Sequence, residues 1–307
     1  MVWQGTRVLV TGGAGFIGSN LAHGLISQGA IVKVVDDLSS GSVENIPDSA
    51  QFFETSITDR AAMSHALEEV DFVFHLAAIA SVPLCEQDPE GSSAVNRDAS
   101  LWILEEAGCP VVFASSAAIY GHPVSIPIDE SHPLSPLGEY GQQKADVDLR
   151  ILSGAHTSSA LRFFNVYGYG QDPSSPYSGV LSIFTDRTLA GQGITIFGDG
   201  EQTRDFVHVS DVVKACLSVG ESLLQDGFDS VVAGQSYNVC TGSATTLNAV
   251  VETIARIMGK DIHVTHSVGR EGEIDHSLGN SSKITEHLGW MPEINLEEGL
   301  TDLLGLS

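Results

Sequence analysis

The segment from Val10 to Asn20 reads Val-Thr-Gly-Gly-Ala-Gly-Phe-Ile-Gly-Ser-Asn and directly follows the apolar run that begins at Arg7. Its glycines at positions 12, 15 and 18 are expected at the turn between a first strand and a first helix. This spacing lets the backbone approach a pyrophosphate closely, while the N-terminus of the helix supplies N–H groups and a partial positive charge. A glycine triplet alone also fits an ordinary tight turn.

The sequence around this triplet favours a dinucleotide site. An amphipathic stretch that starts with Phe16 and Ile17 follows the turn, and a second apolar run, residues 31–35, ends at Asp36. An acidic side chain at this point can accept hydrogen bonds from both ribose hydroxyls and repels a 2′-phosphate. The sequence therefore predicts NAD, rather than NADP, as the cofactor.

Composition and charge exclude several classes of protein. The net charge of −25, from 14 basic and 39 acidic residues, argues against nucleic acid or an anionic membrane as a partner. Adaptation to a salty cytoplasm and ordinary solubility both account for this acidity. We expect no transmembrane helix, no signal peptide and no metal site, because the apolar runs, the N-terminus and the ligand spacings do not suit them. The four cysteines are scattered singly, which indicates reduced thiols and a cytoplasmic protein.

Strand-like and helix-like segments alternate through the first half of the chain, which predicts an α/β fold with a doubly wound, Rossmann-like parallel sheet. Strands are expected at residues 8–10, 31–35, 51–54, 72–75, 111–114 and 161–164. Helices are expected around 16–28, 60–69, 92–107 and 139–152. The segments near 206–222 and 236–239 are expected to return to this sheet. We thus predict an NAD-binding domain of residues 1–165 and 206–240, and a smaller mixed substrate lobe of residues 166–205 and 241–307.

Three positions indicate catalysis. Ser116 ends the expected fifth strand, at the edge where doubly wound sheets bind ligands. Tyr140 and Lys144 are four residues apart and share one helix face. A nearby ammonium, together with a positive nicotinamide ring, stabilises a phenolate and should lower the pKa of Tyr140 toward neutrality. A Tyr-x-x-x-Lys pair also occurs by chance on solvated helices, but after a dinucleotide turn and a strand-end serine pair the catalytic interpretation is favoured.

With these motifs the chain resembles the extended short-chain dehydrogenases/reductases, and within them the nucleotide-sugar 4-epimerases of the UDP-glucose and UDP-N-acetylglucosamine type. The similarity covers nearly the whole chain, from about Arg7 to Leu300. Besides the glycine turn, Ser115-Ser116 and Tyr140-x-x-x-Lys144, it rests on VDDL at 35–38, HLAAIASV at 75–82, RFFNVYG at 162–168, RDFVHV at 204–209 and LGWMP at 288–292.

The resemblance implies a set of cofactor-binding residues. Asp36 and Asp37 would hold the adenosine ribose, and Asn96 would sit beside the cofactor. The expected set is Gly12, Gly15, Phe16, Ile17, Gly18, Asp36, Asp37, Leu38, Ser40, Ser56, Ile57, Leu76, Ala77, Ala78, Asn96, Ser115, Tyr140, Lys144 and Phe164. Among the departures from the family pattern, Ser56 replaces a frequent aspartate, and Gln143 replaces the usual serine before the lysine.

The resemblance also assigns catalytic and substrate-binding roles. Tyr140 would act as the base, Lys144 as its electrostatic partner and nicotinamide-ribose ligand, and Ser116 as a proton-sharing donor. Arg204 and Arg270 would clamp the pyrophosphate, which suits their planar forks, although a structural ion pair is the alternative for each. The substrate-binding set is Ala80, Ser81, Ser116, Asn165, Val180, Arg204, Arg270, Glu273 and Ser277.

The residues after Ser116 distinguish between related reactions. Ala117 and Ala118 stand where relatives that dehydrate or decarboxylate usually carry a carboxylate, so the resemblance favours epimerisation at C4 through a transient 4-keto sugar. Ser277 resembles a gate on the C2 side of the sugar that, when small, admits an N-acetyl group. We therefore expect UDP-glucose and UDP-galactose, and also UDP-GlcNAc and UDP-GalNAc, as the UDP-sugar substrates.

The sequence leaves two alternative functions open and also predicts an oligomeric state. Another sugar-nucleotide enzyme of the same group, such as a uronate 4-epimerase or a 4-ketoreductase, would share every motif except the pocket. A non-catalytic NAD-binding regulator would be expected to lack Tyr140 or Lys144. Trp102 lies on a helix that in this family often helps form a two-fold dimer, so a homodimer is expected.

Overall fold

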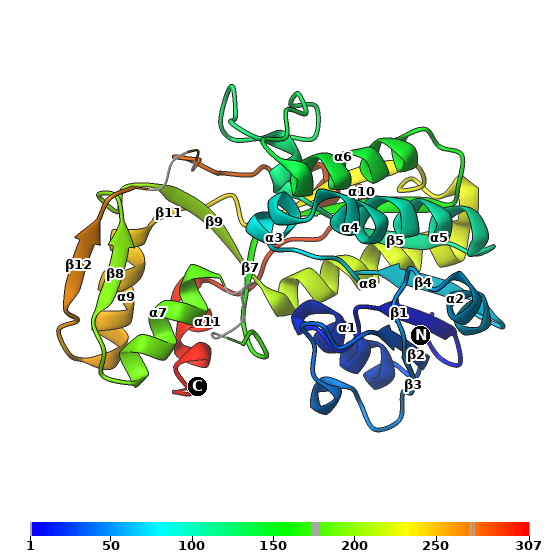
Figure 1. Cartoon of the computed structure of the whole chain (residues 1–307), viewed down its shortest axis with the longest axis horizontal. Coiled ribbons are helices and arrows are strands. Elements are labelled where there is room, and N and C mark those ends of the chain that lie inside the picture. Colours follow the sequence, from blue (N-terminus) through cyan, green and yellow to red (C-terminus); the bar gives the residue numbers. More distant parts are fainter. Residues whose placement is uncertain (1, 173–178, 270–271, 273, 307) are drawn as a thin grey trace.

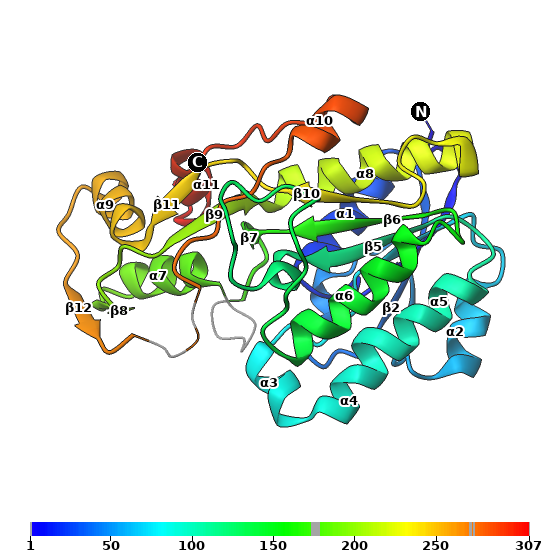
Figure 2. The same cartoon turned by 90° about the horizontal axis from the view of Figure 1, so that it is seen from above.

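The computed structural model describes residues 2–172, 179–269, 272 and 274–306. Its centre is a seven-stranded sheet in the order β10-β6-β5-β4-β1-β2-β3, in which all neighbouring strands run parallel (Figures 1 and 2). The strands are β1 (Arg7–Thr11), β2 (Ile31–Asp36), β3 (Gln51–Glu54), β4 (Phe72–His75), β5 (Val111–Ser116), β6 (Ser158–Phe163) and β10 (Gln235–Val239). The strand order reverses between β1 and β4, where such sheets bind ligands. The predicted doubly wound fold is confirmed.

Helices cover both faces of this sheet, as Figure 2 shows. One face carries α1 (Phe16–Ser27), α8 (Val209–Asp226) and α10 (Ser282–Leu288). The other carries α2 (Arg60–Leu67), α4 (Pro89–Ser93), α5 (Ser100–Glu106) and α6 (Glu139–Leu152). The short α3 (Val82–Gln87) lies next to α4. Short 3-10 turns are η1 (Val43–Asn45), η3 (Ala117–Tyr120) and η4 (Gly227–Asp229).

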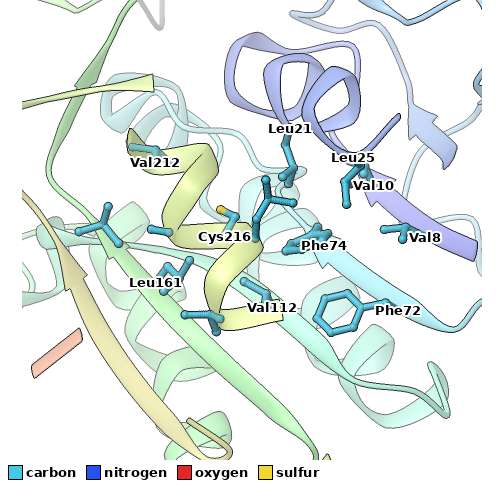
Figure 3. Close-up of a cluster of buried hydrophobic side chains, with 14 of the residues drawn as sticks. Val8, Val10, Leu21, Leu25, Phe72, Phe74, Val112, Leu161, Val212 and Cys216 are labelled. Carbon is cyan, nitrogen blue, oxygen red and sulfur yellow. The ribbon is translucent and has the colours of Figure 1, made fainter. Parts of the chain in front are cut away.

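The strands are apolar on both faces because each face is covered. In β1, Val8 and Val10 join the core under α1 and α8, whereas Leu9 points into the core under the opposite helices. Figure 3 shows side chains of the first core, with Leu21 of α1 and Cys216 of α8 lying against the strands. Successive side chains of a strand alternate between faces, so this pattern fixes the register of β1 in the sheet.

The second half of the chain builds a smaller unit beside the large sheet (Figure 1). It contains a sheet of β11 (Ala244–Thr246), β9 (Thr203–His208) and β7 (Asn165–Tyr167), and a two-stranded sheet of β12 (Val264–Ser267) and β8 (Ile194–Phe197). The helices α7 (Val180–Leu189), α9 (Leu247–Met258) and α11 (Leu296–Leu303) pack around a separate apolar core.

Some expected elements differ from the observed ones. The expected helix at 92–107 is divided into α4, a π-helical turn η2 (Ala94–Ala99) and α5. Of the segment 206–222, α8 packs on the large sheet, but residues 206–208 belong to β9 in the smaller unit. Ile284 and Trp290 pack in the core under the large sheet. The division into two domains stays a prediction. No helix in the described ranges is long and apolar enough to cross a membrane.

A buried ion pair fixes α6 against β6. Arg162 is 1% exposed, and its guanidinium binds the Asp148 carboxylate through two hydrogen bonds of 2.7 and 3.1 Å. A third N–H donates to the Tyr120 hydroxyl at 2.8 Å, and the Ser236 hydroxyl donates to Asp148 at 2.8 Å. Because both charges are desolvated, the loss of either partner leaves an uncompensated charge in the core.

We expect Arg162→Leu to lower the free energy of unfolding by about 3–5 kcal/mol, because Asp148 then stays buried without its counter-charge. Urea denaturation measures this difference. The control is Glu105→Gln, which removes the exposed ion pair with Arg150 and should cost less than about 1 kcal/mol. Equal losses in the two variants would contradict the assignment of a stabilising role to the buried pair.

Candidate active site

A cleft of about 1110 Å³ lies at the carboxyl ends of the strands of the large sheet. Its walls come from the glycine-rich turn, the end of β2, the loop after β4, the end of β5, the first turns of α6, and the chain around β7 and the start of α7. This is the position at which an open α/β sheet binds its ligand, because the strand order reverses there.

The glycine-rich turn and the loop after β4 approach so closely that there is no room for a side chain. A Cβ on Gly12 would lie 2.7 Å from the Ala77 nitrogen, and Gly12 has a φ of +70°. A Cβ on Gly18 would lie 2.0 Å from the Gly12 carbonyl oxygen. Among the described residues, no side chain caps the N-terminus of α1, and Phe16 and Ile17 of its first turn line the cleft. The turn thus presents backbone N–H groups to the cleft.

Asp36, the last residue of β2, lies against the glycine-rich turn. Its carboxylate accepts hydrogen bonds from the backbone N–H of Ala14 at 3.0 Å and of Leu38 at 2.9 Å. Burial raises the pKa of Asp36, while these two backbone donors lower it. Near the end of β5, the Ser115 hydroxyl oxygen is buried and has no hydrogen-bond partner among the described residues. The close backbone approach, the helix N-terminus, the carboxylate and this hydroxyl together fit a dinucleotide such as NAD.

The predicted catalytic side chains meet in the same cleft. Tyr140 lies in the first turn of α6 and Ser116 at the end of β5, and both residues line the cleft. The Lys144 ammonium lies 6.0 Å from the centroid of the Tyr140 ring and donates to the carbonyl oxygen of Ala114 at 2.8 Å. Lys144 is 2% exposed. A phenol, a hydroxyl and an ammonium therefore converge at the ends of β5 and α6.

Burial dominates the pKa values of these groups. It raises the pKa of Tyr140 to about 12, although the nearby Ser116 hydroxyl acts in the opposite direction. It lowers the pKa of Lys144 to about 7. The expected shift of Tyr140 toward neutrality is therefore not produced by the protein's own groups, because desolvation outweighs them. Lowering the pKa of Tyr140 requires a further positive charge near the phenol, and the ring of an oxidised nicotinamide would provide it.

Most of the residues that the sequence assigns to the site line this cleft. They are Gly12, Gly15, Phe16, Ile17, Gly18, Asp36, Asp37, Ser40, Ile57, Leu76, Ala77, Ala78, Ala80, Ser115, Ser116, Tyr140, Lys144, Phe164, Asn165 and Val180. Their individual roles stay predictions.

Six other assigned residues are not among those that line the cleft. Ser56 and Ser81 make local turn and cap hydrogen bonds, to Thr58 and Leu84 respectively. Leu38 donates its backbone N–H to Asp36, and Asn96 is buried behind the cleft. The backbone N–H of Ser277 donates to the carbonyl oxygen of Thr203, which also accepts from the Arg204 guanidinium at 2.9 Å. Arg270 and Glu273 lie outside the described residues.

Several lining residues are outside the set of individually assigned site residues. Gly170, Gln171 and Asp172 belong to a breaker-rich loop whose composition marks it as a site segment, although residues 173–178 of that loop lie outside the described ranges. Leu84, Gln87, Asp88 and Ser92 come from α3 and α4. These helices reach the cleft only through the tertiary packing, and no sequence signal indicates it.

Comparisons with known proteins agree with this geometry. Residues 8–240 match the model of the NAD dependent epimerase/dehydratase family. The UDP-glucose 4-epimerase of Mycolicibacterium smegmatis is 35% identical, with 96% of each chain covered. A crystal structure of the UDP-glucose 4-epimerase of Thermotoga maritima with UDP-glucose has 38% identity and a TM-score of 0.90, with 98% of each chain covered. The UDP-N-acetylglucosamine 4-epimerase of Methanobrevibacter ruminantium has 34% identity and a TM-score of 0.90, with 99% of this chain and 98% of that chain covered.

The buried ammonium of Lys144 predicts a pH-dependent stability. Its pKa is about 7 in the folded protein and near the ordinary value of 10.5 in the unfolded chain. Between these pH values the unfolded chain binds the additional proton, so the free energy of unfolding of the nucleotide-free protein should rise with pH across this window. Below pH 7 both states are protonated and the full cost of burying the charge remains.

The Lys144→Met variant should lack this rise. The difference between the slopes of the two proteins can reach about 1.4 kcal/mol per pH unit, measured by urea unfolding between pH 7 and 9.5. Parallel pH profiles for the wild type and Lys144→Met would show that Lys144 is not desolvated as described.

Proposed function

The chain belongs to the NAD dependent epimerase/dehydratase family, and from this membership we propose that it is an NAD-dependent 4-epimerase of UDP-sugars. It interconverts UDP-glucose and UDP-galactose through a transient 4-keto sugar. The observation that carries this proposal is the convergence of Ser116, Tyr140 and Lys144 in the cleft that also contains the glycine turn and Asp36. Relatives and solved structures with the same reaction in their names cover nearly the whole chain.

Proton transfer is the part of the reaction that falls to the side chains. The glycine turn and Asp36 would hold NAD, which would supply the acceptor for the hydride from C4 of the sugar and its donor for return to the opposite face. Tyr140 accepts the O4 proton in the first half of the cycle and gives it back in the second. The hydroxyl of Ser116, which lines the same cleft as Tyr140, shares this proton. The Lys144 ammonium, 6.0 Å from the centroid of the Tyr140 ring, and the positive ring of a bound nicotinamide would together favour the phenolate against the effect of burial.

The residues next to Ser116 give the 4-keto intermediate no route other than reduction at C4. Ala117 and Ala118, which follow Ser116 at the end of β5, have no group that could remove a proton at C5. Asp88 is one of the carboxylates that line the cleft. Its side chain caps α4 by accepting a hydrogen bond from the Gly91 N–H at 3.0 Å. The oxidised sugar therefore returns to the alcohol at C4, which favours epimerisation over dehydration.

The proposal extends to the N-acetylamino sugars. Ser277 is small and half-buried, and its backbone N–H is held by the Thr203 carbonyl at 3.1 Å. A solved relative of 34% identity is named a UDP-N-acetylglucosamine 4-epimerase. The name of this relative and the small side chain of Ser277 support the extension, although Ser277 is not among the described residues that line the cleft. We also propose a homodimer in the cytoplasm, since Trp102 lies on a helix that often forms a two-fold contact in this family.

A panel of nucleotide sugars tests the proposal against its rivals. Inversion at C4 of UDP-glucose, followed by proton NMR, supports the 4-epimerase. Turnover of uronate sugars alone would favour a uronate 4-epimerase, and consumption of external reductant would favour a 4-ketoreductase. A protein that binds NAD and inverts none of the sugars would be a regulator.

The Tyr140→Phe variant removes the proton acceptor and should lower kcat by roughly 10²-fold or more, because general acid–base help of this size is lost. Tyr169→Phe is the matched control, since Tyr169 is 78% exposed and should leave kcat unchanged. Initial rates of C4 inversion measure both variants. Near-normal turnover by Tyr140→Phe would rule out its assignment as the base.

Ser277→Tyr should lower kcat/KM for UDP-GlcNAc by about 10-fold or more relative to UDP-glucose, because a bulky side chain fills the space beside C2. The ratio of the two kcat/KM values is the measurement, since it cancels general losses of activity. A wild-type protein with no turnover of UDP-GlcNAc, or a variant with an unchanged ratio, would contradict the gate.

A further inference from the structure

A chain of buried polar side chains connects β1, β4, α5, the π-helical turn, α6 and α4, and of its members only Ser92 lines the cleft. Each member is at most 2% exposed; in order, they are Thr11, His75, Ser100, Asn96, Gln143 and Ser92. Buried polar groups of this kind are costly unless every donor finds an acceptor, so their hydrogen bonds define a specific arrangement.

The hydrogen-bond directions in the first half of the chain follow from His75. Burial lowers the pKa of this side chain to about 3, so the imidazole is neutral. The Ser100 hydroxyl donates to the carbonyl oxygen of Asn96 at 2.8 Å, so its oxygen accepts from Nε2 of His75, also at 2.8 Å. Nδ1 of His75 then accepts from the Thr11 hydroxyl at 2.6 Å.

This arrangement holds the loop that follows β4 at two points. The hydroxyl oxygen of Thr11 accepts hydrogen bonds from the backbone N–H groups of Leu76 and Ala77, each at 3.2 Å. Two residues further on, Asn96 binds both backbone groups of Ile79: Oδ1 accepts the N–H at 2.8 Å, and Nδ2 donates to the carbonyl at 3.0 Å. The loop therefore has little freedom to move relative to β1 and the π-helical turn.

Gln143 connects this loop to the helix that carries Tyr140 and Lys144. Its Oε1 accepts from Nδ2 of Asn96 at 2.8 Å, which uses the second amide hydrogen of Asn96. Its Nε2 donates to the Ser92 hydroxyl at 2.8 Å. Gln143 thus joins α6, α4 and the loop after β4 through fully buried bonds, and it lies on α6 between Tyr140 and Lys144.

We propose that Gln143 is a positioning residue that, through Asn96, holds the catalytic helix at a fixed distance from the loop of residues 76–80. Gln143 is not among the residues that line the cleft, whereas Tyr140 on one side and Ala77, Ala78 and Ile79 on the other are. The distance between these two walls sets how the phenol meets the sugar and the cofactor, and misplacement by about 1 Å can cost roughly 10²-fold in rate. Its effect on turnover rests on the proposed function; its effect on the loop does not.

Gln143→Leu tests this proposal, because leucine fills a similar volume and removes one hydrogen bond each from Asn96 and Ser92, while Asn96 keeps its bonds to Ile79. Backbone hydrogen exchange in residues 76–80, measured by mass spectrometry, should accelerate by roughly tenfold or more. With UDP-glucose, kcat should fall about tenfold, while KM changes by less than about threefold.

Gln142→Leu provides the matched control. It is the same substitution one position earlier on α6, at an exposed residue whose amide binds Asp146 at 2.8 Å. It should leave hydrogen exchange in residues 76–80 and kcat unchanged. Gln143→Glu keeps an acceptor for Asn96, so its exchange rate should lie between those of the wild type and Gln143→Leu, and it decides the question if the leucine variant does not fold.

Exchange in residues 76–80 that stays at the wild-type rate in Gln143→Leu, or in Gln143→Glu if only that variant folds, would overturn the proposal, even if kcat falls. The same holds if Gln142→Leu matches Gln143→Leu in both measurements. The two proposals fail separately: full activity of Tyr140→Phe refutes the proposed reaction, whereas the exchange measurement needs no turnover.

Discussion

The rest of the site depends on the contact between the glycine turn and the loop after β4. A Cβ at Gly12 would lie 2.7 Å from the Ala77 nitrogen, so two backbones touch where other residues would separate them. This contact brings the N-terminus of α1 and the end of β4 to the same cleft. Because the strands are parallel and the order reverses between β1 and β4, Asp36 and Ser116 reach that edge as well. The geometry of the sheet thus assembles residues from distant parts of the chain.

Burial creates both the reactivity of the site and its cost. Desolvation raises the pKa of Tyr140 and lowers that of Lys144, so each group is pushed toward its neutral form. A phenolate beside an ammonium is therefore unfavourable without a further positive charge. In the proposed reaction, this requirement would couple deprotonation of Tyr140 to the oxidised state of the cofactor, because only the oxidised nicotinamide ring is positive. The side chains then take a proton when the cofactor can take a hydride.

The sequence predicts those features of the fold and the site that depend on local patterns and short motifs. The apolar runs around Val8–Val10 and the Gly12–Gly18 turn predict the parallel sheet, and the four-residue spacing predicts that Tyr140 and Lys144 share a face. It predicts much less of what depends on packing between distant segments. The buried position of Gln143 beside an exposed Gln142 follows from the orientation of α6 against α4, and nothing in the residue type distinguishes them. The rise in the Tyr140 pKa has the same origin, since the degree of burial is not a local property.

The net charge of the chain is compatible with a phosphate site that the glycine turn builds from backbone N–H groups. A protein of net charge −25 repels a dinucleotide and a sugar nucleotide, both anionic, at distances where charges interact through solvent. In the cell this repulsion is screened beyond about 8–10 Å, so binding is decided by groups within direct contact. Backbone N–H groups at the start of α1 provide positive potential without a basic side chain, and they work only where glycines let a phosphate approach. The acidic surface and the glycine-rich turn are therefore compatible, because they act at different distances from the ligand.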